Sequence, residues 1–364
     1  MTTPVNPLKQ HFGDRLRRAR LMSGLSLRAL GEALDGRVSH AALAKYEKGL
    51  IGPNSTVLIA LGRALNVDND YFFRSTAVAL SGIEFRKRTK CTKKEVDRIR
   101  EEAHDFFERY LEVEAILGLK NPQKQKFDLT QLTDPSELAH AVEQSAVKLR
   151  QKWKLGQNPI QNLHEELEHG GVKVKEVEAN SHFDGFCGWA DDRIPVIVLA
   201  KHLNENLPRK RFTAAHELGH LVLGLPAGLE KKREEALCNR FAGAFLMPAE
   251  GIKEFGSKRS KVTLGELKAL KEEWGLSLQA IMRRLEDLKI ITPSRRKSFD
   301  FLYRTKYRWH QTGEPGQWHG SETATRFHQL VYRAAAEELI TRAKAAGLLD
   351  IRQREFDKSM AVMG

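Results

Sequence analysis

The chain has 364 residues, of which 41% are hydrophobic and 29% charged, so it can bury a core and is too long for one typical domain. Lysine and arginine outnumber aspartate and glutamate by 60 to 47, and the net charge of +13 favours acidic partners such as nucleic acid. The three cysteines lie far apart, which argues against a disulfide framework. The N-terminal residues lack the apolar core of a signal peptide, and no stretch has the apolar length of a membrane span. We therefore expect a cytoplasmic protein with no membrane partner.

Residues 12–73 have the pattern of a compact helical unit. Apolar residues recur at helical spacing, and glycine and proline breaks separate short helices. Ser26 and Ser39 each stand where a helix N-cap is expected. The apolar positions are Leu16, Ala19, Leu27, Leu30, Ala33, Leu43, Leu58, Leu61 and Leu65.

This unit resembles the Cro/C1-type (XRE) helix-turn-helix, a five-helix DNA-binding domain that we assign to residues 1–75. The likeness rests on the segments 16–20, 24–26 and 45–49 together with Leu30, Val38, Ser39 and Pro53. It implies a buried ion pair between Arg20 and Glu47, and a recognition helix at Ser39–Lys48 whose start enters the major groove. The residues expected to face DNA are Arg28, Arg37, Ser39, His40, Ala41 and Lys45.

Few long polar side chains occur on this recognition surface. A helix-turn-helix that serves protein contact or dimerisation therefore stays open as a second interpretation. We expect a homodimer because repressor-type units of this kind dimerise.

Residues 76–157 are expected to form a helical connector. A basic run spans Phe85–Lys94, and helices are predicted at Glu95–Leu117 and Ser136–Trp153. The basic run can follow a phosphate backbone, although solvated charge is the commoner explanation of such runs. The same two explanations apply to Arg295–Lys297 and Arg304–Arg308.

Residues 158–260 change to a mixed pattern. Val172–Val177 alternates with period two and Ile194–Ala200 is a short apolar run, so both predict strands. The apolar strand at Pro195–Leu199 can be either an edge that pairs with an extended substrate or an ordinary internal strand. Helices are predicted at Leu163–His169, Arg209–Leu223 and Lys231–Leu246.

The motif His216-Glu217-Leu218-Gly219-His220 carries the sharpest chemical signal. Residues four apart share one face of a helix, so both imidazoles can reach one ion. A catalytic zinc takes three protein ligands and keeps one position for water, and the glutamate between the histidines can accept the proton of that water. The helix is otherwise apolar, so its buried polar groups would be costly without partners.

The third metal ligand is expected on the next helix, Lys231–Leu246, because the short connection favours an antiparallel helix pair. Glu235 and Asn239 are four apart and share a face, whereas the apolar residues form an adjacent stripe for packing. We select Glu235 as the third ligand, and Glu234 remains the rival.

The histidine motif, the run of Glu235, Asn239 and Ala242, and the sequence Leu246-Met247-Pro248 together resemble the ImmA/IrrE family of metallopeptidases. The likeness includes Val196–Leu199 and Arg211–Thr213 and covers roughly residues 160–250. It implies Zn²⁺ as the cofactor, held by His216, His220 and Glu235, with Glu217 as the general base. It also implies a substrate class, because family members cleave helix-turn-helix repressors and so release stress or phage genes.

Three further residues, His182, His202 and Arg211, are candidates for stabilising an oxyanion, and each has an alternative structural role. Cys187 lies between glycines just before the apolar strand. Since a thiolate is a good zinc ligand, one hypothesis is that Cys187 caps the open zinc position and holds the enzyme inactive. The alternative is a small buried residue.

Residues 261–364 are expected to be helical, with Trp274, Leu278, Ile281 and Leu285 on one stripe and a final helix at about Glu322–Ala345. They resemble the helical tail of longer fused members of the peptidase family. The overall prediction is a mainly α protein that contains a small α+β zincin-like peptidase domain. Two other interpretations stay open, a DNA-binding regulator whose zinc domain senses rather than cleaves, and an antitoxin-like regulator.

Overall fold

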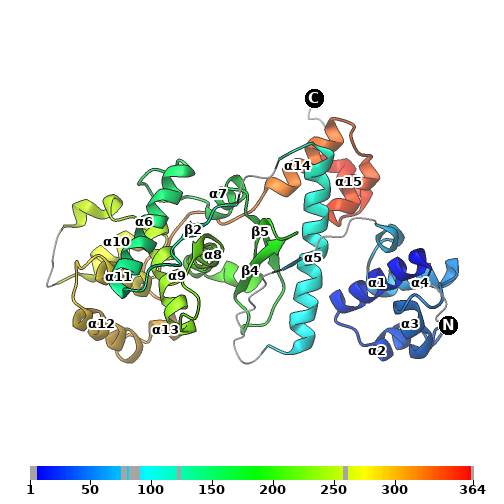
Figure 1. The fold of residues 1–364 in the computed structure, drawn as a ribbon, viewed down its shortest axis with the longest axis horizontal. Helices are drawn as coiled ribbons and strands as arrows, with labels where there is room; N and C mark the ends of the chain where they lie inside the picture. Colours follow the sequence, from blue (N-terminus) through cyan, green and yellow to red (C-terminus); the bar gives the residue numbers. More distant parts are fainter. Residues whose placement is uncertain (1–5, 75–79, 82–90, 121–123, 257–260, 362–364) are drawn as a thin grey trace.

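The computed structural model describes residues 6–74, 80–81, 91–120, 124–256 and 261–361. Within these ranges the protein is mainly helical and has one four-stranded and one two-stranded sheet, which confirms the predicted fold class (Figure 1). Residues 85–90 of the expected basic run lie outside the described residues. Within the same ranges, no helix has the length and apolarity that a membrane crossing requires.

The N-terminal unit contains four α-helices and a closing 3₁₀ helix in place of the five helices expected. Ser26 and Ser39 cap α2 and α3, since their side chains accept hydrogen bonds from the backbone N–H groups of Ala29 and Ala42 at 3.1 and 3.2 Å. The elements are α1 (Pro7–Met22), α2 (Leu27–Ala33), α3 (His40–Glu47), α4 (Ser55–Leu65) and η1 (Asn69–Phe73).

The expected ion pair between Arg20 and Glu47 is present and bidentate. Arg20 Nε and Nη2 donate to the two carboxylate oxygens of Glu47 at 2.6 and 3.0 Å. A third hydrogen bond, of 2.8 Å, runs from Arg20 Nη1 to the carbonyl of Leu25. These contacts join α1 to the end of the recognition helix α3 and to the turn before α2.

The long helix α5 (Lys93–Ile116) receives the N-terminal unit through buried charges. Arg15 and Glu108 form an ion pair of 2.6 Å, with side chains 3% and 4% exposed. Arg18 adds pairs to Glu108 at 2.8 Å and to Glu101 at 3.1 Å. Because several of these charges are buried, the N-terminal unit is held in a defined orientation on α5.

The main sheet has the strand order β1-β4-β5-β3. Strand β5 pairs antiparallel with β4 and parallel with β3, so it is internal. Edge pairing of a substrate with Pro195–Leu199 is therefore excluded, because both edges of that strand are already occupied. The strands are β1 (Leu80–Ser81), β3 (Lys173–Val177), β4 (Gly185–Ala190) and β5 (Ile194–Ala200).

Strand β4 is absent from the sequence-based expectation. Its sequence Gly-Phe-Cys-Gly-Trp-Ala contains two glycines and no β-branched residue, which are poor strand signals. The sequence signal that could have predicted this strand is the pair Asp191 and Asp192. These residues form the turn from β4 into β5, with φ values of 50° and 57°.

Helices cover both faces of this sheet. One face packs against α5 and the C-terminal helices, whose buried residues form a shared core with Val196 and Val198. The expected final helix at Glu322–Ala345 is two separate helices, because the chain breaks at Glu338, where φ is 57°, and restarts at the N-cap Thr341. These two helices are α14 (Arg326–Ala336) and α15 (Arg342–Leu349), and a third C-terminal helix, α16 (Gln353–Ser359), follows them.

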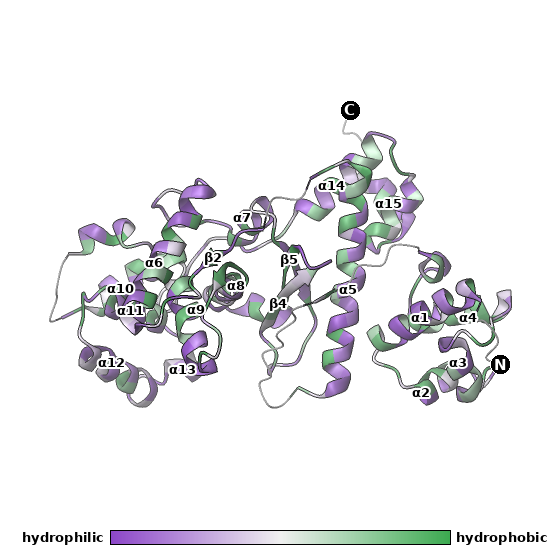
Figure 2. Ribbon diagram, viewed as in Figure 1, coloured by the Kyte–Doolittle hydropathy of each residue, from purple (hydrophilic) through white to green (hydrophobic). Residues whose placement is uncertain are grey.

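The other face of the sheet packs against α8 and then α9, where Figure 2 shows hydrophobic residues along β5 and α8. The predicted stripe of Trp274, Leu278, Ile281 and Leu285 is buried in this core, but Gly275 splits it between two helices. Both cores contain residues from either side of the domain boundaries expected near residues 157 and 260.

The remaining elements are β2 (Phe127–Asp128), α6 (Pro135–Lys152), α7 (Leu163–His169), η2 (Lys201–Glu205), α8 (Leu207–Val222), β6 (Leu223–Gly224), α9 (Lys231–Leu246), η3 (Glu250–Phe255), α10 (Leu264–Trp274), α11 (Leu278–Asp287), α12 (Pro293–Thr305) and α13 (Trp309–Thr312).

The ion cluster between α1 and α5 predicts an acid-sensitive stability. Burial alone would raise the pKa of Glu108, but hydrogen bonds with His104 and Arg18 and the charges of Arg18 and Arg15 outweigh it and lower the pKa to about 2. The unfolded carboxyl titrates near 4.5. The stabilisation is therefore complete above that pH and is lost as pH falls towards 2, with a limit of about 3 kcal/mol.

We expect the free energy of unfolding of Glu108→Gln to depend less on pH between about 5 and 2 than that of the wild type. Denaturant titrations at several pH values measure this. Glu32→Gln is the matched control, because the pair of Glu32 with Arg28 is exposed. Parallel pH profiles for Glu108→Gln and the wild type would contradict the role of the cluster.

Candidate metal centre

Helix α8 positions the histidine motif. The helix starts where the Asn206 side chain accepts a hydrogen bond from the N–H of Arg209 at 3.1 Å, and it ends where the chain extends into β6. Ala214, Ala215 and Leu218 are fully buried in the core that α8 shares with the sheet and α9. This packing fixes the rotation of α8 about its axis.

Gly219, inside the motif, lets α9 approach α8 closely. A Cβ at this position would lie 3.2 Å from Cδ1 of Phe241 and 3.4 Å from Cα of Cys238, both on α9. A Cβ here would be a tight contact that requires α9 or the Phe241 ring to shift by a few tenths of an ångström. The small residue therefore brings the start of α9, with its two glutamates, within reach of the imidazoles.

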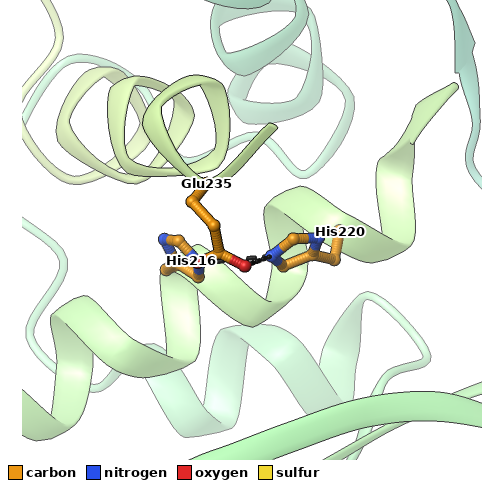
Figure 3. A group of neighbouring side chains, drawn as sticks. All are labelled: His216, His220 and Glu235. Carbon is orange, nitrogen blue, oxygen red and sulfur yellow. Dashed lines mark hydrogen bonds and ion pairs between the residues drawn. The ribbon is translucent and has the colours of Figure 1, made fainter. Parts of the chain in front are cut away.

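The imidazoles of His216 and His220 and the carboxylate of Glu235 converge on one point (Figure 3). The two Nε2 atoms are 3.2 Å apart, and the Glu235 oxygens lie 3.5 Å from His216 Nε2 and 3.8 Å from His220 Nε2. Ligand atoms in a tetrahedral zinc site, with bonds of about 2.0–2.1 Å, are separated by roughly 3.3 Å. The donor set and its spacing therefore fit a zinc ion.

Glu234, the rival ligand, approaches His220 from the other side of the ring. Its Oε1 lies 3.2 Å from His220 Nδ1. A carboxylate at Nδ1 holds the proton there and leaves Nε2 free to coordinate a metal. Sequence spacing alone did not decide which of Glu234 and Glu235 is the metal ligand. Two adjacent residues near the start of a helix differ only in the direction of their side chains.

Glu217 lies on α8 between the two histidines and is almost completely buried. A cavity of about 310 Å³ adjoins the site and is bordered by His220, Glu234 and strand β6, with Lys126 and Thr130 on either side of β2. The sequence analysis missed Lys126 and Thr130 as cavity residues, because the two-residue strand between them leaves no periodic signal.

A second buried polar cluster supports the start of α8. Arg211 Nη2 donates to the carbonyl of Ile160 at 2.7 Å, and its Nη1 lies 3.4 Å from the carboxylate of Glu322. The guanidinium carbon of Arg211 lies 4.1 Å from the centre of the Trp318 ring. Burial lowers the pKa of Arg211 to about 10, and burial raises the pKa of Glu322 to about 7 against the charge of Arg211. Burial, with the charges of Lys210 and Arg211, holds the pKa of His164 well below its ordinary value.

Arg211, one of the three oxyanion candidates from the sequence, contacts Ile160, Glu322 and Trp318 in this cluster. These contacts give it a structural role. Another candidate, His202, lies 3.7 Å from Asp184. His182 is half-buried, and its backbone N–H donates to the side chain of Asn180 at 2.9 Å. None of the three belongs to the group of ligand atoms described above.

Cys187 lies on β4 and is buried in the core that includes Ala214, Ala215 and Leu218 of α8. Its side chain therefore faces the helix that carries the histidines. Cys187 is not part of the group of His216, His220 and Glu235, whose ligand atoms all lie within 4.8 Å of one another.

The six residues expected to face DNA are all exposed, as the recognition surface of a helix-turn-helix requires. Arg28 forms an exposed pair with Glu32 at 3.2 Å, and Arg37 lies 3.8 Å from Asp35. The structure places four of these residues at the start of α3 or on that helix, with Arg28 on α2 and Arg37 in the turn between them. These residues are Arg28, Arg37, Ser39, His40, Ala41 and Lys45.

Comparison with known protein families identifies two domains. Residues 168–286 match a peptidase family model described as the IrrE N-terminal-like domain, and residues 11–70 match a helix-turn-helix domain. The first match runs from the end of α7 through α11 and so includes the histidine helix and α9. The resemblances of the N-terminal unit to a helix-turn-helix and of the histidine region to the ImmA/IrrE peptidases are confirmed.

Curated relatives named as HTH-type regulators match a short part of the chain. Uncharacterized HTH-type transcriptional regulators of Sinorhizobium medicae (strain WSM419) and Rhizobium meliloti (strain 1021) are each 37% identical over 68 residues. Another from Sinorhizobium fredii (strain NBRC 101917 / NGR234) is 35% identical over 71 residues. These alignments cover 19–20% of this chain and 48% of each relative, so the chain spans about half the length of the curated relatives it matches.

The geometry predicts different consequences for the two glutamates at the start of α9. Glu235→Gln should lose most zinc affinity, because it removes a ligand carboxylate. Glu234→Gln should lose less, about 10- to 100-fold, because it changes only a group that orients a ligand. Competition with a chromophoric chelator measures both affinities. Glu230→Gln, at the exposed N-cap of α9, is the control. If Glu234→Gln is the more damaging change, the ligand assignment is wrong.

Proposed function

We propose that this chain, which joins a helix-turn-helix domain to an IrrE-like peptidase domain, is a zinc-dependent endopeptidase. Its substrate would be a helix-turn-helix repressor whose cleavage derepresses stress, phage or mobile-element genes. One observation carries the proposal. Two imidazoles and a carboxylate from adjacent helices converge with ligand spacing, and a buried glutamate lies between the two histidines in the sequence.

His216, His220 and Glu235 would hold the zinc, and Glu234 would keep His220 in the tautomer that coordinates through Nε2. When bound, zinc would supply a coordinated water of lowered pKa and would polarise a peptide carbonyl. Glu217 would be the general base, holding a proton taken from water and passing it to a leaving amine. The cavity beside His220 would admit part of the substrate chain.

The helix-turn-helix domain supports DNA binding. We propose that Ser39, His40, Ala41 and Lys45 meet the major groove, that Arg28 and Arg37 meet phosphates, and that two copies of the chain bind as a homodimer. In this arrangement the domain would bring the peptidase to the operator where its repressor substrate is bound.

A second candidate function is a transcriptional regulator, or an antitoxin-like protein, whose metal domain senses rather than cleaves. The curated relatives that match a short part of the chain are named as transcriptional regulators, which favours this second function. The buried Glu217 favours the peptidase, because a purely sensory metal site has no use for a general base.

We expect Glu217→Gln to keep its zinc and to lose cleavage activity by about 10²- to 10⁴-fold, the usual contribution of a general base. The assay incubates the zinc-loaded protein with a short helix-turn-helix repressor encoded next to its gene and follows the fragments by electrophoresis. Glu205→Gln, at an exposed position in η2, is the control. If wild type and Glu217→Gln have equal effects on the target genes in cells, the sensor function replaces the peptidase.

We also propose that the Cys187 thiol restrains the enzyme by capping the metal position that water would occupy. The support is that its side chain faces α8 from β4. Cys187→Ala should raise the basal cleavage rate at unchanged zinc content, and Cys238→Ala, a buried cysteine on α9, is the matched control. An unchanged basal rate in Cys187→Ala would reject the restraint.

A further inference from the structure

Helix α12 and the turn that follows it form a basic surface that the metal centre does not use. Five exposed cations occur in residues 295–308, and in the described parts of the chain none of them forms a salt bridge to a carboxylate. Arg296 differs, because it pairs with Glu286 and Asp300. We call this surface the α12 surface, and its cations are Arg295, Lys297, Arg304, Lys306 and Arg308.

The packing of α12 explains why these charges face solvent. Tyr303 is buried, and its hydroxyl donates to Glu314 at 3.2 Å, while Phe299 one turn earlier packs against it. Lys297, Phe301 and Arg304, spaced at i, i+4 and i+7, lie on another face. Phe301 is 65% exposed, so this face has no intramolecular cover at its centre. Figure 2 shows α12 and α13 as largely hydrophilic segments.

Helices α12 and α13 lie along the same edge of the molecule as α2 and the recognition helix α3 in the view of Figure 1. In Figure 1, α12 and α13 are at the lower edge of the peptidase body, and α2 and α3 are at the lower edge of the N-terminal unit. The start of α5, with exposed Lys93 and Lys94, lies at this edge between them. The buried pair of Arg15 and Glu108 holds the N-terminal unit on α5, and α5 packs on one face of the sheet. Phe299 of α12 packs against the core on the other face, so this packing relates α12 to the N-terminal unit.

We propose that the α12 surface is a second DNA contact, which binds the phosphate backbone of the duplex next to the site held by α3. This rests on the proposed DNA binding of the helix-turn-helix domain. A duplex carries one negative charge per about 1.7 Å, and each phosphate neutralised by a cation releases counterions. The five cations are suited to this contact because no salt bridge within the described residues has to break. An acidic protein partner is the alternative occupant, and the experiment below distinguishes it.

The test uses full-length, zinc-loaded protein and two duplexes, of about 16 and about 40 base pairs, over a range of salt concentrations. The α12 variant combines Lys297→Gln, Arg304→Gln and Lys306→Gln. The control variant makes the same change in charge at Arg333, Arg342 and Arg354, which are exposed on the C-terminal helices at the opposite edge. A recognition variant, Arg28→Gln with Lys45→Gln, reports on the helix-turn-helix. Equal thermal unfolding and zinc content show that all variants are folded.

We expect the α12 variant to bind the short duplex like the wild type and to bind the long duplex more weakly. The slope of log K against log salt on the long duplex should decrease by about 2–3, since each lost phosphate contact removes about 0.9. The recognition variant should bind both duplexes more weakly than the wild type. The control variant should weaken the binding of both duplexes slightly and to the same extent.

Two results would overturn the proposal while leaving the helix-turn-helix function in place. One is equal behaviour of the α12 and control variants on the long duplex. The other is normal DNA binding by the α12 variant together with loss of repressor cleavage, which would assign the surface to a protein partner. If the wild type binds neither duplex, the proposed DNA binding fails and the second contact fails with it.

Discussion

The close packing of α8 against α9 is the constraint on which the metal centre depends. Two histidines one turn apart can only offer two ligands, and the third has to come from a different helix. Gly219 allows that helix to approach, because a Cβ at this position would crowd Phe241 and Cys238. Glu235 then lies beside both Nε2 atoms, and Glu234 lies beside Nδ1 of His220. The donor spacing is therefore a consequence of helix packing, which the apolar face of α8 and the sheet behind it maintain.

Helix α5 connects this centre to the DNA-binding unit. On one side it accepts Arg15 and Arg18 of α1 into a buried ion cluster around Glu108. On another side its aromatic residues pack against the sheet and α14, and Glu114 pairs with the buried Lys173 of β3 at 2.5 Å. Replacing one partner of such a buried pair is strongly destabilising, because the other charge stays buried. The helix thereby couples the orientation of the recognition helix to the sheet that supports α8.

The proposed DNA contact at α12 follows from the same rigidity. A basic surface on a freely tethered domain would add only non-directional attraction to a duplex. Buried charges hold the N-terminal unit on α5, and packed cores join α5 to the body that carries α12, so the same surface would add phosphate contacts in register with the operator. The peptidase and the DNA-binding unit would then meet the duplex together, close to where a repressor substrate is bound.

The sequence by itself determined the local features, because these depend on residues only a few positions apart. The boundaries of α7, α9 and β5, the caps Ser26 and Ser39 and the shared helical face of His216 and His220 all followed from periodicity and cap chemistry. Only the tertiary structure decided the internal place of β5, the existence of β4, the return of the C-terminal helices to α5 and the different directions of Glu234 and Glu235. These tertiary features depend on which surfaces, distant in the sequence, pack together. The energies that select one packing over another are summed over whole cores, so no short stretch of sequence predicts them.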